Sequence, residues 1–304
     1  MKAFGNFLLT TRTRAALSVA ALTLLAIAFP PFSYILSGTP LALVTLRKGV
    51  TFGTQVALLS LALTLLATLA LNMPPALPLA FLVSVWIPVL CCAEVLRKTQ
   101  SQGMMVLCAG AAGLLFTASI YARLDELQNW WQDLFQRLQD YGLSQLDAAQ
   151  LEQANQLVTS LLSALFASGF VLGLISALLL ARWWQSALFN PGGFREEFHA
   201  LRLPRALVFA TMVGLLGLLL VPSFTSGAIR DAVILMLILY LFQGLSVMHY
   251  YFYTRGIPRI GSIGLYGTFF VLPHFILLFV TCVGLVNACV GWTPARATDK
   301  TDHG

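Results

Sequence analysis

Long runs of apolar residues without charge set the strictest limit on the fold of this chain. Of its 304 residues, 58% are hydrophobic and 10% are charged, whereas soluble domains carry about 25% charged residues. Runs of this length cross a bilayer core about 30 Å thick as helices. The composition excludes a soluble protein and predicts an all-α fold, a polytopic transmembrane helical bundle with about eight to nine membrane segments. The runs are residues 15–29, 31–46, 50–71, 76–96, 102–121, 157–181, 205–222, 230–252 and 264–290.

We expect one transmembrane domain over residues 1–304. It divides into N-terminal helices (15–121), an outer amphipathic insertion (122–156), C-terminal helices (157–290) and a flexible tail (291–304). Pro30 and Pro31 interrupt the first two runs, because proline lacks a backbone donor and disfavours helix in the residue before it. Residues 15–46 are therefore expected to form a short hairpin, with a single crossing as the alternative. A secretory signal is disfavoured, because no small-x-small cleavage site precedes the prolines.

The positions of Lys and Arg predict the orientation, since cytoplasmic loops hold the excess of these residues. With the hairpin, the N-terminus is cytoplasmic, the C-terminus lies outside, and the membrane is the bacterial inner (plasma) membrane. The outer side keeps Arg123, Arg137, Arg230, Arg296 and Lys300. The inner side then holds Lys2, Arg12, Arg14, Arg47, Lys48, Arg97, Lys98, Arg182, Arg195, Arg202, Arg205, Arg255 and Arg259.

The outer insertion at 122–156 predicts two helices. Apolar residues from Leu124 to Tyr141 recur at helical spacing opposite the acidic residues, which indicates an amphipathic helix that Gly142 closes. A second helix is expected to begin at Ser144 and to continue into the span that ends near Arg182, so it projects beyond the membrane. The Trp130-Trp131 pair indicates interfacial anchoring, with a ligand-stacking platform as the alternative.

Charged side chains are missing from the middle of the predicted spans, which argues against a proton- or sodium-coupled transporter. Glu94 lies near Arg97 and Lys98 at an inner helix end, and Asp231 lies beside Arg230 at an outer end. His274 is the ionisable residue placed near a bilayer midplane, so it is a candidate site residue, with a neutral packing role as the alternative. No zinc, disulfide or P-loop spacing occurs, so we expect no metal site, no catalytic residues and no cofactor.

The segment NPGGFREEFHALRLPR at 190–205 is the densest cluster of candidate binding residues. Asn190 is expected to cap a helix over 191–203 that starts with Pro191 and lies at the inner interface. One stripe of this helix is aromatic and the next is basic, and the Pro-Gly-Gly turn offers backbone donors to an anion. A plain membrane-surface connector is the alternative. The candidate ligand- or partner-binding residues are Asn190, Pro191, Gly192, Gly193, Phe194, Arg195, Glu197, Phe198, His199, Arg202, Arg47 and His274.

The strings ARWWQSALFNPGGF and PGGFxxEFHALRLP, with GTPLALVTLRKG at 38–49, resemble the YybS-like family of uncharacterised multipass membrane proteins, domain-of-unknown-function family 2232. The resemblance covers about residues 10–290. It implies a helical fold distantly similar to the S components of energy-coupling-factor transporters and to the cell-shape protein MreD, and it implies no established reaction. The chain departs from the family near its end, where VNACVGWTPAR lacks the acidic residue and basic tail expected there.

Three functions follow as hypotheses. The first is a non-enzymatic scaffold or partner subunit of an envelope-associated complex, which contacts the lipid bilayer and other membrane proteins but no nucleic acid. It would use the 191–203 helix and small-residue faces such as Gly169/Gly173 and Ala109/Gly113. The second is an S-component-like binder of a small vitamin-like solute, with a pocket opening outward beneath 122–156 and a separate ATPase as energy source. The third is an intramembrane hydrolase, since Glu196-Glu197 and Arg202 are similar to the EExxxR protease signature, although the spacing here is EExxxxR.

Overall fold

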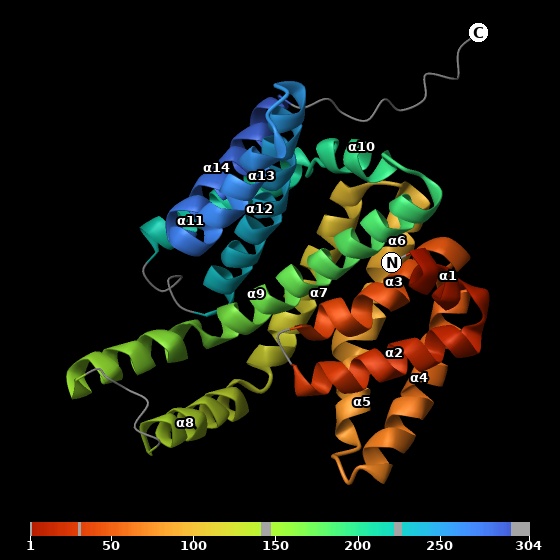
Figure 1. Cartoon of the computed structure of the whole chain (residues 1–304). Coiled ribbons are helices and arrows are strands. Elements are labelled where there is room, and N and C mark those ends of the chain that lie inside the picture. Colours follow the sequence, from red (N-terminus) through yellow and green to blue (C-terminus); the bar gives the residue numbers. More distant parts are fainter. Residues whose placement is uncertain (1, 30–31, 141–146, 222–226, 293–304) are drawn as a thin grey trace.

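The structure is a computed structural model that describes residues 2–29, 32–140, 147–221 and 227–292. Within these residues every regular element is a helix, and the helices form a bundle (Figure 1). In chain order they are α1 (Lys2–Thr10), α2 (Arg12–Ala28), the π-helical turn η2 (Tyr34–Gly38), α3 (Thr39–Lys48), α4 (Val50–Ala70), α5 (Ala76–Phe81), the π-helical turn η3 (Leu82–Trp86), α6 (Ile87–Thr99), α7 (Gln102–Tyr121), α8 (Leu124–Asp140), α9 (Ala148–Phe189), α10 (Gly193–His199), α11 (Arg205–Leu220), α12 (Ala228–Thr254), α13 (Arg259–Val271) and α14 (Pro273–Val290). The predicted all-α class is confirmed.

Six helices in the described residues are long and apolar enough to cross a membrane, which implies contact with a lipid bilayer. They are α4, the continuous unit Ala76–Thr99, α7, α9, α12 and α14, and α11 is a shorter apolar helix. The total is lower than the eight to nine segments expected from the sequence. The runs at 15–29, 31–46 and 205–222 account for the difference, because their helices α2, α3 and α11 are shorter. The run at 264–290 supplies one candidate span, α14, although the chain breaks at Leu272 into α13 and α14. Pro273 follows the break and has no N–H to continue the α13 hydrogen-bond ladder.

The N-terminal segment is a helical hairpin, as predicted. The Thr23 hydroxyl of α2 lies 2.7 Å from the Ser37 hydroxyl of η2, and the indole Nε1 of Trp86 donates to the same Ser37 oxygen at 2.7 Å. All three side chains are buried. Residues 30–31, the Pro-Pro pair at the predicted turn, lie outside the described residues. The hairpin returns α3 to the end of the bundle at which α2 begins.

Basic residues gather at one end of the bundle, which we call the basic end. The Arg12 guanidinium lies 5.4 Å from the ring centroid of Phe52 at the start of α4, and Gly49 lies against the Arg97 guanidinium. The loops that these contacts join therefore lie on one side, as the sequence predicts. The basic end includes Arg12, Arg47, Lys48, Arg97, Arg182, Arg195, Arg202 and Arg255.

The outer insertion consists of α8 and the first part of α9, and its predicted helices are present. α8 is amphipathic, and none of its residues is fully buried. α9 has 42 residues, so at 1.5 Å per residue it is about 63 Å long and extends beyond a bilayer core. It begins at Ala148, where the Asp147 carboxylate accepts a hydrogen bond from the Gln150 N–H at 2.8 Å. The predicted start at Ser144 and the Gly142 cap lie outside the described residues.

The last helix ends at the basic end, so the predicted position of the C-terminal helix end on the opposite side is wrong. The Arg202 guanidinium, between α10 and α11, donates to the Gly291 carbonyl directly after α14 at 3.1 Å. Because the chain reverses at Leu272, α13 leads away from the basic end and α14 leads back to it (Figure 1). The expected flexible tail lies outside the described residues from position 293 onward.

The core is centred on α9, whose Leu174, Ile175 and Leu178 are fully buried. α12 and α14 approach each other most closely at two glycines. A Cβ added to Gly244 would lie 1.9 Å from the Val280 carbonyl oxygen, and one added to Gly284 would lie 2.0 Å from the Tyr240 carbonyl oxygen. This pair therefore fixes the packing of α14 against α12, and α12 forms one wall of the candidate site.

Candidate functional site

The 190–205 segment folds as a short helix, α10, rather than as the predicted helix over 191–203. Asn190 is the C-terminal cap of α9, and the N-terminal cap of α10 is Gly192, with a φ of 98° that favours glycine. The Ser186 hydroxyl donates to the Asn190 carbonyl at 2.6 Å and accepts the Phe194 N–H at 3.1 Å. The backbone donor expected to face an anion is therefore used by a side chain of α9. Residues 201–204 are not helical.

A buried ion pair anchors α10 to α9. The Arg182 guanidinium donates to both carboxylate oxygens of Glu197, at 2.8 Å and 2.5 Å. Both side chains are at most 7% exposed. A paired, bidentate geometry offsets the cost of removing two charges from water. The pair therefore ties α10 to α9 at Glu197.

This ion pair bears directly on the hydrolase hypothesis. Two glutamates that activate one water must converge on it, but Glu196 is exposed whereas Glu197 is buried against Arg182. They therefore point to different surroundings. A general base also needs a free carboxylate near the reacting proton, and both oxygens of Glu197 accept bonds from Arg182. The arrangement does not fit a paired-glutamate protease site.

A cavity of about 490 Å³ lies between α9, α10, α12 and α13, and we call it the inner cavity. It contains the aromatic stripe of α10, so Phe194 and Phe198 line a pocket, and their rings stack with centroids 5.7 Å apart. Most of the lining is apolar or aromatic, with polar groups from α10, α12 and α13. The lining residues are Ser176, Leu179, Leu180, Trp183, Phe194, Arg195, Phe198, His199, Phe242, Leu245, His249 and Tyr266.

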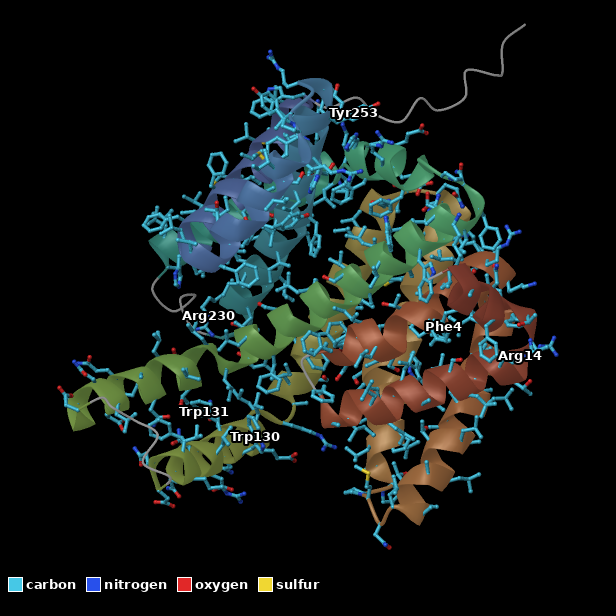
Figure 2. The ribbon with its side chains drawn as sticks, in the orientation of Figure 1. Phe4, Arg14, Trp130, Trp131, Arg230 and Tyr253 are labelled. Carbon is cyan, nitrogen blue, oxygen red and sulfur yellow. The ribbon has the colours of Figure 1, made fainter. Side chains whose placement is uncertain are left out.

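Polar groups of the inner cavity converge from three helices. His249 of α12 and the hydroxyl of Tyr266 of α13 share a hydrogen bond of 2.9 Å. The Arg195 guanidinium lies 4.8 Å from the ring centroid of Tyr253, a cation–π contact. Tyr253 is labelled in Figure 2. The His199 ring contacts the same tyrosine, with centroids 5.5 Å apart.

His199 is biased toward its neutral form. Burial lowers the pKa of His199, and the nearby positive charges of His249 and Arg195 lower it further. A neutral imidazole offers one donor and one acceptor. At neutral pH, His199 therefore presents a hydrogen-bonding group to the cavity, and Arg195 presents a permanent positive charge.

At the opposite end, a buried carboxylate joins three helices. Asp231 of α12 is fully buried, accepts the Tyr121 hydroxyl of α7 at 2.9 Å and also accepts the Ser163 hydroxyl of α9. Arg230 donates to its other oxygen at 2.9 Å and 3.0 Å and to the Ser160 carbonyl at 2.7 Å (Figure 2). Because these partners come from α7, α9 and α12, Asp231 is a structural junction at the ends of the spans opposite the basic end.

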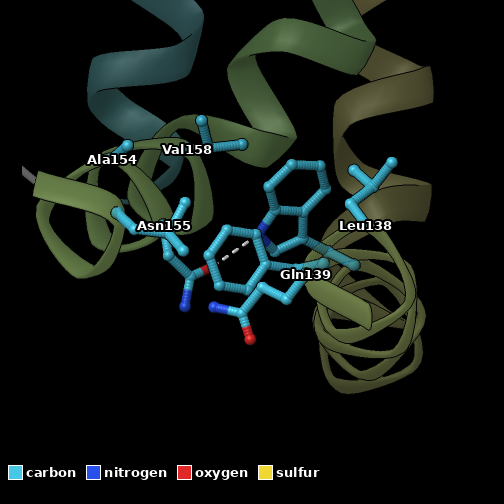
Figure 3. A pocket seen from close by; sticks show the side chains of 8 residues that line it. Leu138, Gln139, Ala154, Asn155 and Val158 are labelled. Atoms are coloured by element: carbon cyan, nitrogen blue, oxygen red, sulfur yellow. Dashed lines mark hydrogen bonds between the residues drawn. The ribbon is translucent and has the colours of Figure 1, made fainter. Parts of the chain in front are cut away.

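A second, smaller cavity lies in the outer insertion between α8 and α9. Its volume is about 240 Å³ and its lining is mainly apolar. Trp131 contributes to the wall, and its Nε1 donates to Asn155 Oδ1 at 2.9 Å (Figure 3). Trp130 is half-exposed and contacts the Phe166 ring edge-on. The two tryptophans therefore have different surroundings.

Comparison with protein-family models matches residues 17–287 to the predicted membrane protein family DUF2232. The chain belongs to the DUF2232 family. The family expected from the sequence resemblance is thus confirmed. No curated protein matches this DUF2232 chain, and no solved structure matches it.

The structure brings four residues of the predicted set of this DUF2232 chain into the inner cavity: Phe194, Arg195, Phe198 and His199. The others have different positions. Pro191 and Gly192 are exposed, whereas Gly193 is buried against the Asn190 amide. Glu197 pairs with Arg182 behind the cavity.

Three predicted residues lie away from the cavity lining. Arg47 lies over the Phe189 ring at 4.2 Å and so borders the end of α9. Arg202 binds the Gly291 carbonyl. His274 is exposed at the start of α14.

Sequence reasoning did not predict His249 and Tyr266 as site residues. Their signal in the sequence is weak, because each follows an ordinary helical pattern and becomes notable only when α12 and α13 meet. Among the described residues, no group of three His, Cys, Asp or Glu side chains is placed to hold a metal ion.

Proposed function

We propose that this DUF2232 protein is a non-enzymatic integral membrane protein that binds a small molecule in the inner cavity. Its volume of about 490 Å³ lies within the range of about 300–1,000 Å³ typical of ligand pockets. Its lining also has the typical composition, an apolar wall with a few polar groups that converge from separate helices. This cavity is the observation that carries the proposal.

The proposed site differs in position from the outward-opening pocket expected beneath 122–156. The cavities there have volumes of about 240 Å³ and 330 Å³, and the inner cavity exceeds both. In the S-component-like version of the proposal, a separate ATPase supplies the energy. A binder of this kind therefore needs no charged residue in the middle of the membrane.

We further propose the bacterial inner membrane as the location, with the basic end toward the cytoplasm. Basic loops favour the cytoplasmic side, and the N-terminus lies at the basic end. The two arms of the N-terminal hairpin and α11 are proposed to lie in the membrane beside the six candidate spans. With α13, which leads away from the basic end before α14 returns to it, the proposed total is ten, an even number that places both ends of the described chain at the basic end.

Thermal unfolding of the purified full chain tests the binding function. Ligand binding to the native state raises the melting temperature by mass action, so a panel of vitamin-like solutes and amphiphiles is screened for a shift. The variant Ser176→Phe fills the cavity from α9, and Ser160→Phe makes the same change at an exposed position of α9. We expect the shift in the wild type and in the Ser160 variant but not in the Ser176 variant. Equal shifts in both variants, or no shift with any compound, contradict the proposal.

A second candidate function, a partner subunit of an envelope-associated complex, is favoured by the surface of α13. Cβ atoms added to Gly264 and Gly267 would meet nothing within 4 Å, and Phe270 next to them is 89% exposed. Uncovered glycines let another membrane helix approach closely. Gly169→Leu on α9 is the matched variant, because its added Cβ also meets nothing within 4 Å, and it distinguishes the α13 face from the Gly169/Gly173 face.

Site-specific crosslinking in native membranes tests this second function. A crosslinked species formed from α13 that Gly264→Leu abolishes and Gly169→Leu keeps supports it. A crosslinking pattern unchanged by Gly264→Leu contradicts it.

A further inference from the structure

The inner cavity carries the positive charge of Arg195 at its rim, without a balancing carboxylate in the described lining. Arg195 and His199 reach it from α10, and His249 reaches it from α12. No Asp or Glu is among its lining residues in the described chain. The glutamates of α10 do not balance this charge, since Glu196 is exposed and Glu197 is bound to Arg182.

The Arg195 charge is held in place and remains available to a ligand. Its guanidinium lies over the Tyr253 ring, 4.8 Å from the ring centroid, and the residue is exposed. A guanidinium presents donors in a planar fork that matches a phosphate or carboxylate. An anion at the rim would meet both this fork and the His199 ring, which contacts the same tyrosine.

The remainder of the cavity wall is apolar and continues into a membrane-spanning helix. Leu179, Leu180 and Trp183 lie on α9, and Phe242 and Leu245 face them from α12. α9 and α12 are both candidate membrane spans. Trp183 is 41% exposed, so the wall extends to the surface that lipid covers. The cavity therefore joins a positive rim at the basic end to an apolar cleft at membrane depth.

We propose that the ligand of the inner cavity is an anionic amphiphile, a molecule with a phosphate or carboxylate head and an apolar chain. The head binds Arg195 and His199 at the rim, and the chain lies between α9 and α12 along Leu179, Trp183 and Phe242. This inference rests on the proposed function and adds the ligand class. A lipid of the bilayer and a soluble single-chain phosphate both have this chemistry.

Binding to the full chain in detergent, measured by native mass spectrometry and by melting temperature, tests the ligand class. The probes are phosphatidylglycerol, phosphatidylcholine, dodecyl phosphate, an uncharged dodecyl ether and inorganic phosphate. Arg195→Gln removes the rim charge, and Arg205→Gln removes one charge from an exposed site at the start of α11 outside the cavity lining.

We expect phosphatidylglycerol or dodecyl phosphate to bind. Arg195→Gln is expected to lower the affinity at least about tenfold, because the variant loses one hydrogen bond to a charged group. Arg205→Gln is expected to leave the affinity within about twofold, since exposed charges contribute little. Binding of phosphatidylglycerol alone identifies a bilayer lipid as the source, and binding of dodecyl phosphate alone identifies a soluble amphiphile.

Other outcomes overturn the inference in distinguishable ways. Equal binding of the uncharged ether and phosphatidylcholine, lost in Ser176→Phe, keeps the proposed binding function and refutes the anionic class. Inorganic phosphate binding as tightly as dodecyl phosphate refutes the role of the apolar wall. Equal weakening by the two arginine variants assigns the effect to the general charge of the basic end. If no probe and no panel compound binds, the proposed function fails as well.

Discussion

Breaking the buried ion pair between α9 and α10 is expected to be among the most destabilising single changes in this protein. In Glu197→Gln, the Arg182 guanidinium keeps its charge but loses the carboxylate that binds it at 2.8 Å and 2.5 Å. Since the two side chains are only 7% and 5% exposed, water cannot replace the lost partner. Removing one partner of a buried pair costs about 3–5 kcal/mol, and we expect Glu197→Gln to lower the free energy of unfolding by that amount.

A second ion pair provides the matched control. Glu94 binds Arg97 at 2.7 Å on one turn of α6, with 39% of the arginine side chain exposed. Pairs accessible to water contribute about 0–1 kcal/mol, so Glu94→Gln is expected to cost no more than that. The same Glu→Gln change is therefore expected to lower the free energy of unfolding by about 3–5 kcal/mol at Glu197 and by about 0–1 kcal/mol at Glu94.

Denaturant unfolding in detergent micelles measures both free energies. Trp183 and Trp184 follow Arg182 directly in α9, so tryptophan fluorescence reports on this region. The double variant Arg182→Met/Glu197→Met removes both charges together, and we expect it to recover at least half of the loss, since apolar replacement of a buried pair is often close to neutral. If Glu197→Gln costs as little as Glu94→Gln, or if the double variant is worse than the single one, the reasoning about a buried pair is refuted.

Three further predictions concern packing, pH and topology. Gly284→Ala is expected to destabilise by about 1–3 kcal/mol through overpacking against α12, whereas Gly264→Ala, which meets no atom, is expected to be neutral or stabilising in thermal unfolding. Because the pKa of His199 is lowered from 6.5 in the folded chain, the unfolded state takes up the proton first as pH falls below about 6.5. Stability is then fully present above that pH and declines below it, and a pH series in which His199→Gln shows the same decline as the wild type contradicts this. Single cysteines at Lys48 and Gly291 are expected to react with an impermeant thiol reagent from the same side of the membrane, and labelling from opposite sides rejects the α13–α14 reversal.

Sequence patterns correctly predicted the helices that depend only on the spacing of neighbouring residues. The amphipathic spacing from Leu124 onward predicted α8, and the uninterrupted apolar pattern before Arg182 predicted the long α9. The Phe194 and Phe198 stripe was also recognised as a unit, because residues four apart lie on one face of a helix. Such patterns do not depend on where the rest of the chain lies.

The parts that sequence reasoning missed depend on distant partners. Glu197 was expected to be a ligand- or partner-binding residue, but it pairs with Arg182 of α9, because α10 begins at the left-handed Gly192 and packs against α9. The inner cavity needs Tyr266, which the turn between α12 and α13 brings opposite His249. Neither contact has a sequence spacing that identifies it.

α9 is one continuous helix that is longer than a bilayer core is thick. Asn155 borders the outer cavity and Leu179 borders the inner one, about 36 Å apart along the same axis at 1.5 Å per residue. Since no residue between them interrupts the helix, a tilt of about 5° displaces one wall by about 3 Å relative to the other over that length. A displacement of the projecting end of α9 would therefore change the width of the inner cavity at its other end.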